Sequence, residues 1–141
     1  MATEREKMPA GEWYVSADPE LVAARVRARQ LVQRYNATVP DLIARPERRA
    51  ILELLLGACG RDVTIEPPFH CDYGDNITLG DEVFMNFQCV LLDCARITIG
   101  AQAQLQPADV PGHLTLGLDD VERLASPVEC QQAFDRAEPE Q

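Results

Sequence analysis

Two helical patterns, followed by a six-residue repeat of apolar side chains, predict an α+β fold for this chain of 141 residues. The helical patterns fall within residues 1–62, the repeat occupies residues 63–105, and an acidic tail fills residues 106–141. We expect a helical hairpin, then a short parallel β-helix, then an irregular or weakly helical tail. The length is that of one domain.

The first helix is expected to begin after Asp18. Asp18, Pro19 and Glu20 supply an N-cap residue, a first-turn proline and a first-turn acid in that order. Apolar residues then recur with a period close to 3.6, which is typical of a helix with one buried face. These residues are Leu21, Val22, Val26, Ala28, Leu31, Val32 and Tyr35.

The second helix is expected to follow Pro46 and to end at Gly57 or Gly60, where glycine would stop it. Its apolar residues are Ile51, Leu52, Leu54, Leu55 and Leu56. The two helices should pack as a hairpin.

The helical period is lost at Val63, and a shorter repeat begins. The segment Ile77–Gly80 recurs as Ile97–Gly100, at an offset of 20 residues. Six-residue steps suit a three-sided coil, because each face turns one apolar side chain to the axis and a small residue follows at the turn. A pair of antiparallel hairpins is the alternative, although Gly-Asp and Gly-Ala turns suit it less well than Asn-Gly. The expected inward positions are Leu79, Met85, Leu91 and, after a two-residue insertion, Ile99 and Leu105.

Composition excludes several classes of partner. Acidic residues outnumber basic residues by 23 to 13, which argues against nucleic acid and against an anionic membrane surface. We find no apolar run long enough to span a bilayer and no signal peptide, so we expect a cytoplasmic protein. The five cysteines are odd in number and form no C-x-x-C pair, which indicates reduced thiols rather than disulfides or a zinc site.

Three collinear segments carry a family resemblance: residues 6–18, residues 25–36, and residues 65–93 with the run Ile65-Glu-Pro-Pro-Phe-His-Cys-Asp-Tyr-Gly-Asp-Asn76. Over about residues 4–105 the chain resembles the sugar O-acetyltransferases typified by maltose and galactoside O-acetyltransferase, which are hexapeptide-repeat acyltransferases. The resemblance implies a left-handed β-helix, a homotrimer with active sites between subunits, acetyl-CoA as co-substrate, a small sugar as acceptor, and no metal.

The resemblance also implies site residues. Asn86 falls on the family's active-site asparagine, which would contact the acetyl group of acetyl-CoA. The family's general base is a histidine, and His113, 27 residues beyond Asn86 and without a following proline, is the downstream candidate. The residues expected to bind the sugar are Asp72, Asp93, Arg25, Tyr14 and Asp18, with Ser16 as the alternative to Asp18.

These expectations define an acetyl-CoA-dependent sugar O-acetyltransferase. Beyond Leu105 the family's later coils, which carry most acetyl-CoA contacts, are missing or replaced, so we expect impaired activity. The alternative is a non-catalytic fragment or regulatory subunit that associates with intact relatives. A dinucleotide- or phosphate-binding enzyme is disfavoured because the sequence holds no glycine-rich phosphate loop.

Overall fold

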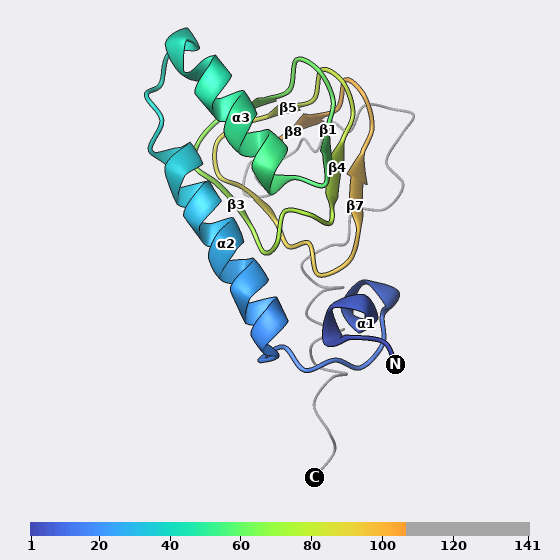
Figure 1. The fold of residues 1–141 in the computed structure, drawn as a ribbon. Coiled ribbons are helices and arrows are strands. Elements are labelled where there is room, and N and C mark those ends of the chain that lie inside the picture. The colour runs from blue at the N-terminus through green and yellow to red at the C-terminus, as the bar shows by residue number, and fades with distance from the viewer. Residues whose placement is uncertain (107–141) are drawn as a thin grey trace.

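The structure is a computed structural model that describes residues 1–106. Residues 107–141 of the expected acidic tail, His113 among them, lie outside the described residues. Helices α2 and α3 run side by side against a small coil of strands, and α1 lies below that coil in the view of Figure 1. The helical elements are α1 (Glu4–Ala10), α2 (Pro19–Asn36), a 3-10 turn η1 (Leu42–Ala44) and α3 (Arg45–Leu55).

The coil is a parallel β-helix with three faces. One face holds β1, β4 and β7, the second holds β2, β5 and β8, and the third holds β3 and β6, all paired in parallel. This confirms the coil and excludes antiparallel hairpins. The strands are β1 (Ala58–Cys59), β2 (Thr64–Ile65), β3 (Phe69–Cys71), β4 (Ile77–Leu79), β5 (Phe84–Met85), β6 (Cys89–Leu91), β7 (Ile97–Ile99) and β8 (Gln104–Leu105).

Each turn of the coil repeats after 20 residues. Partners one turn apart are Thr78 and Thr98 on the first face and Phe84 and Gln104 on the second. The first strand already lies at Ala58–Cys59, upstream of the point where the helical period is lost. The five inward positions expected from the repeat are all buried, which confirms the phasing: Leu79, Met85, Leu91, Ile99 and Leu105.

Gly80 holds the small position expected at the turn, and the reason is close packing between turns and not a left-handed backbone. The left-handed backbone at the repeated corner belongs to Asp62, Glu82 and Gln102, not to glycine. Gly80 is needed because the turns stack closely there, and a Cβ at Gly80 would lie 2.6 Å from the backbone nitrogen of Ala101. Its substitution would force two turns of the coil apart.

The helical hairpin is confirmed, with two corrections. Asp18 is the N-cap of α2, since its Oδ1 accepts the N–H of Glu20 at 3.0 Å. Val22 and Val26, however, are 40% and 48% exposed, so the buried stripe of α2 is narrower than the apolar pattern suggests. Helix α3 ends at Leu55 without a left-handed glycine cap, and Gly57 instead lies against the backbone of Asp75.

The helical hairpin caps the first turn of the β-helix, whose strand edges would otherwise be unpaired. The Asn36 side chain brackets Phe69 of β3, donating to its carbonyl at 3.0 Å and accepting its N–H at 2.9 Å. The hydroxyl of Tyr35 donates to the carbonyl of Ile65 in β2 at 2.6 Å. Arg49 of α3 donates to backbone carbonyls at the end of β1, that of Cys59 at 3.0 Å among them.

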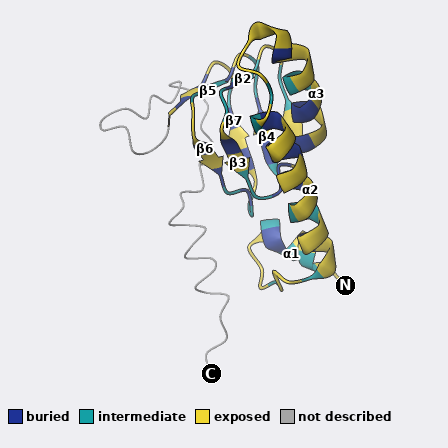
Figure 2. Ribbon diagram, turned by 90° about the vertical axis from the view of Figure 1, so that its left-hand side faces the viewer, coloured by how far each residue is buried: buried dark blue, intermediate teal, exposed yellow. Residues whose placement is uncertain are grey.

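One core runs through the hairpin and the coil. Buried side chains of α2 and α3 pack in a single cluster with the inward residues of the strands. Figure 2 shows the corresponding buried faces on the helices and the coil. Complete burial of one aliphatic side chain stabilises a fold by roughly 1.5–3 kcal/mol, so this cluster supplies most of the driving force.

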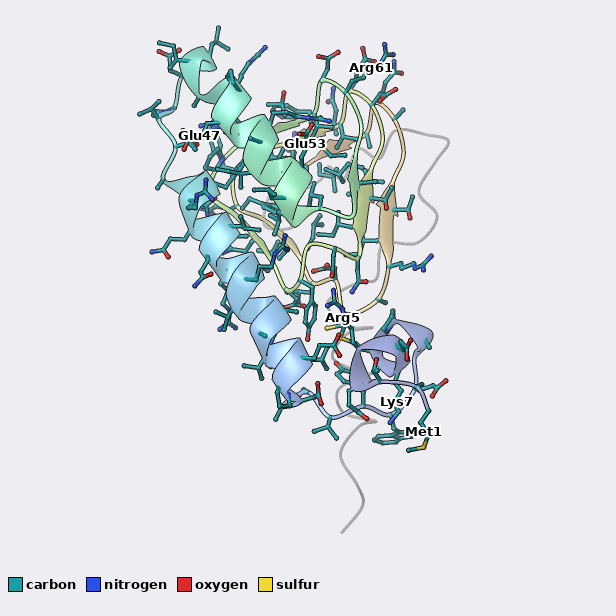
Figure 3. All side chains as sticks on the ribbon, viewed as in Figure 1. Met1, Arg5, Lys7, Glu47, Glu53 and Arg61 are labelled. Atoms are coloured by element: carbon teal, nitrogen blue, oxygen red, sulfur yellow. The ribbon has the colours of Figure 1, made fainter. Side chains whose placement is uncertain are left out.

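Helix α1 was not expected from the sequence, because Pro9 within it reads as a helix breaker. The missed signal is a capping box, in which Thr3 and Glu6 satisfy each other's backbone N–H groups. Arg5 of α1 forms ion pairs with Glu20 and with Asp75 of the coil, and Figure 3 shows it on the side of α1 that faces the coil. These contacts fix the N-terminal segment beside one corner of the β-helix.

Candidate active site

The candidate site lies at the corner where each turn of the coil passes from the β3/β6 face to the β4/β7 face. Residues 72–76 form this corner in the first turn and residues 92–96 form it in the second. Leu79 follows Cys71 at an offset of eight positions, two more than the usual step of six, so the corner is a loop rather than a tight bend. Asp72 and Asp93, two of the expected sugar-binding residues, lie on these loops.

Asp93 is completely buried, with 0% of its surface exposed. Its Oδ1 accepts the N–H of Asp72 at 3.0 Å and of Tyr73 at 2.9 Å, and its Oδ2 accepts the N–H of Asn76 at 3.3 Å. Burial raises the pKa of the Asp93 carboxyl, and these N–H donors oppose the rise. The carboxylate therefore points at the backbone of the neighbouring loop and not at solvent.

Asp72 is only partly buried, in contrast to Asp93. Its Oδ2 lies 3.4 Å from the thiol sulfur of Cys94, a weak hydrogen bond from the second loop to the first. A carboxylate whose partner is a weak donor can still accept hydrogen bonds from hydroxyl groups. Asp72 is thus the aspartate of this corner that is placed to contact a polar ligand.

Arg25 of α2 reaches the same corner. Its guanidinium donates to the hydroxyl of Tyr73 and to the carbonyl of Ser16, both at 2.8 Å, and lies 5.8 Å from the centre of the Tyr73 ring. Burial raises the pKa of Tyr73, while Arg25 favours its ionised form. Arg25 forms no ion pair with a carboxylate among the described residues, so its charge is available to a ligand.

Tyr14 joins these residues from the N-terminal segment. It packs, half-buried, against the small cluster formed by Met8, Leu21 and Tyr73, close to Cys94. Burial raises the pKa of the Tyr14 hydroxyl, and the neighbouring Cys94 adds to the rise. Tyr14 is therefore a neutral hydroxyl next to Asp72 and Cys94.

The remaining expected residues lie elsewhere. The Asp18 side chain caps α2, while Ser16 contributes its carbonyl to Arg25. Asn86 lies at a different corner, between β5 and β6, where its Oδ1 accepts the N–H of Phe87 at 2.8 Å. The amide of Asn86 consequently presents its N–H₂ group as the donor.

Sequence reasoning did not single out Tyr73 and Cys94. Both lie inside the resembling segments, and Tyr73 directly follows Asp72. A helix-and-repeat pattern carries no signal for them, because their role depends on how loops 20 residues apart stack.

A groove of about 740 Å³ lies between the start of α3 and the segment 62–66 that contains β2. None of the residues expected at the site lines it. In residues 1–106 we find no group of three or more His, Cys, Asp or Glu side chains that could hold a metal ion. No helix in this part of the chain has both the length and the apolar character needed to cross a membrane.

Comparisons with known proteins agree with this architecture. The profile described as "Maltose acetyltransferase hexapeptide capping motif" matches residues 7–60. Nodulation protein L of Rhizobium meliloti is 45% identical over 106 residues, which are 75% of this chain and 57% of that protein. A crystal structure of a maltose O-acetyltransferase from Clostridium difficile 630 matches with a TM-score of 0.72 and 37% identity, over 75% of this chain and 56% of that one.

A hexapeptide-repeat acetyltransferase of Vibrio cholerae O1 biovar eltor, solved with acetyl-CoA, matches with a TM-score of 0.63 and 35% identity, over 74% of this chain and 58% of that one. The capped three-sided coil and these matches define a hexapeptide-repeat protein of the acetyltransferase class. Over about three quarters of its length the chain is similar to a maltose O-acetyltransferase and to other hexapeptide-repeat acetyltransferases, and residues 7–60 match the capping motif of that family. It spans a little over half the length of the relatives it matches.

Proposed function

We propose that this chain catalyses the transfer of an acetyl group from acetyl-CoA to a hydroxyl group of a small sugar. The observation that carries the proposal is the likeness of its described part, at 37% identity and a TM-score of 0.72, to a maltose O-acetyltransferase. The corner that gathers Tyr14, Arg25 and Asp72 supports it, because hydroxyls, a carboxylate and a guanidinium are the groups that bind sugar hydroxyls.

The proposed roles follow from the chemistry of each group. Asp72 and Arg25 bind and orient the acceptor, with Tyr14 beside them. His113 takes the proton of the reacting hydroxyl, whose oxygen then attacks the acetyl carbonyl carbon of acetyl-CoA. The carbon–sulfur bond breaks, the sugar ester forms, and CoA leaves with the proton. The N–H₂ group of Asn86 is the donor for the carbonyl oxygen on which negative charge develops.

Asn86 and Asp72 lie at different corners of one coil. A site that uses both would combine corners of neighbouring chains, which supports the homotrimer implied by the family. Size-exclusion chromatography with light scattering tests this assembly, and a monomer would contradict a shared site.

The activity test measures free CoA released from acetyl-CoA in the presence of maltose, glucose or a galactoside. We expect slow, acceptor-dependent release by the 141-residue chain alone, because His113 lacks the proline of the family motif. Asn86→Asp should lower the rate by about 10²-fold. The substitution replaces the N–H₂ donor by a carboxylate oxygen, whose negative charge repels the developing oxyanion. Gln104→Glu, an exposed amide on β8, adds the same charge and should leave the rate unchanged.

Three results would revise the proposal. Turnover as fast as that of a full-length relative would overturn the expected impairment. No acceptor-dependent release by an assembled trimer would favour the non-catalytic alternative. Equal rates for Asn86→Asp and the unchanged chain would remove Asn86 from the reaction.

A further inference from the structure

Asp93 differs from the other aspartates of the candidate site in being sealed from solvent. The family resemblance suggests that Asp93 contacts the sugar. Its carboxylate instead accepts hydrogen bonds from three backbone N–H groups of the preceding turn. The Asn76 side chain completes the arrangement by donating to the Asp93 carbonyl at 2.7 Å. Four hydrogen bonds thus join the loop 92–96 to the loop 72–76.

These bonds occur where the β-helix has no strand pairing. Residues of the strands pair with the next turn through backbone ladders, whereas the extended corners lie outside those ladders. The buried N–H groups of Asp72 and Tyr73 therefore depend on the Asp93 side chain for a partner. Without it, nothing else among the described residues satisfies them.

Two of the three residues whose N–H groups donate to Asp93, Asp72 and Tyr73, contribute side chains to the candidate site. Asp72 carries the partly buried carboxylate, and the hydroxyl of Tyr73 accepts a hydrogen bond from the guanidinium of Arg25. Fixing the backbone at these two positions fixes the spacing between a negative and a positive group. We propose that Asp93 is a positioning residue, which presents Asp72 and, through Tyr73, Arg25 to the sugar without contacting it.

Asp81 provides a matched control for this proposal. It also lies on a corner of the second turn and also accepts a backbone N–H from the turn before it, that of Arg61 at 2.8 Å. Its side chain is nevertheless 46% exposed, pairs with Arg61, and lies at a corner away from the site. Arg61 is labelled in Figure 3, far from Arg5 and the N-terminal segment.

The first experiment follows the reactivity of Cys94, which lies 3.4 Å from the Asp72 carboxylate. Alkylation by N-ethylmaleimide is measured for each cysteine by peptide mass spectrometry at pH 7.5. Cys94 is partly buried and packs against the Asp72 carboxylate and the cluster that holds Tyr73, so the reagent should reach it slowly while the loop 72–76 is held in place. The quantity compared is the alkylation rate of Cys94 divided by that of Cys59. We expect this ratio to rise about tenfold in Asp93→Asn and to stay at the value of the unchanged chain in Asp81→Asn.

A purely structural role would raise both cysteine rates together through global opening, and this result would overturn the proposal. So would an unchanged ratio in a folded Asp93→Asn protein. If that variant does not fold, Asn76→Ala removes only the fourth bond and should raise the ratio in the same direction, by less. An unchanged ratio in Asn76→Ala would then count against the proposal.

The second experiment rests on the proposed function. Sugar affinity is measured by NMR titration with maltose, and Asp93→Asn should weaken it at least tenfold, while Asp81→Asn should not change it. Unaltered affinity in Asp93→Asn would overturn the positioning role. If the unchanged chain binds no sugar at all, the proposed function fails, whereas the cysteine measurement still tests the role of Asp93.

Discussion

Tyr35 shows how one side chain links the helical hairpin to the coil. It is 1% exposed, and its hydroxyl donates to the Ile65 carbonyl across the boundary between α2 and β2. Burial raises the pKa of Tyr35 to about 12, because the ionised phenol would lose its hydration inside the core. Folding therefore favours the neutral phenol, and the pH dependence of stability reports the burial of this side chain.

We expect Tyr35 to stabilise the fold up to about pH 10 and to lose that contribution as the pH rises to about 12. The unfolded phenol ionises first, so the linked loss is about 2–3 kcal/mol for a shift of about two pKa units. Urea unfolding of the unchanged chain and of Tyr35→Phe between pH 8 and pH 11.5 measures it. Tyr35→Phe should be about 1–3 kcal/mol less stable at pH 8, from the unpaired carbonyl, and the gap should narrow above pH 10. A gap that is constant with pH would contradict the raised pKa.

At the scale of elements, the hairpin replaces a missing turn of the β-helix. A strand without a neighbour exposes unpaired backbone groups, and here side chains of α2 and α3 take the neighbour's place. Asn36 is suited to this role because its amide both donates and accepts, as a backbone peptide group does. The cap therefore depends on residue chemistry as well as on apolar contact.

Asn36→Asp tests this cap. The aspartate keeps the bond from the Phe69 N–H but turns a second acceptor toward the Phe69 carbonyl, so we expect a loss of about 1–3 kcal/mol in unfolding free energy. Gln33→Glu makes the same chemical change on the exposed side of α2 and should stay within about 0.5 kcal/mol. Thermal denaturation at neutral pH compares the two. Equal losses would mean that charge, and not the strand cap, decides the result.

At the scale of the whole molecule, the described part has one core rather than a separate hairpin and coil. Native proteins are stable by only about 5–15 kcal/mol, so a defect in one part of a shared core affects all of it. The small cluster under α1 is separate, and holds the N-terminal segment locally. We therefore expect α2 and the strands to unfold together, and α1 to open locally with a smaller free energy.

Met85→Ala tests this cooperativity. Met85 is 0% exposed in the middle turn of the coil, and its truncation should cost about 2–5 kcal/mol. Hydrogen exchange with mass spectrometry should show α2 and β4 losing protection by similar free energies. Val26→Ala on the exposed face of α2 should change neither. Retained protection of α2 alone would show that the hairpin folds independently.

Much of the fold was predictable because its signals are local. A proline after an N-cap aspartate starts α2, and apolar side chains at six-residue steps define the coil wherever it is wound. The narrower buried face of α2 was not predictable, because Val22 and Val26 fit the helical period but no neighbour covers them. The helix α1 carried a signal in its capping box, which Pro9 obscured.

The candidate site was predictable only in part. The family resemblance brought Tyr14, Arg25 and Asp72 onto the list of site residues, and the structure places them at one corner. It also places Asn86 at another corner, which a linear sequence does not reveal.

The period of the coil, the helical hairpin and the family resemblance follow from residues close together along the chain. The burial of Asp93 against the preceding turn and the pairing of Asn36 with the edge of β3 depend on the folded chain. The physical reason is that hydrogen bonds between stacked loops, or between a helix and a strand, join residues far apart in sequence. Whether an aspartate binds a ligand or holds a loop depends on which backbone N–H groups the fold brings within its reach.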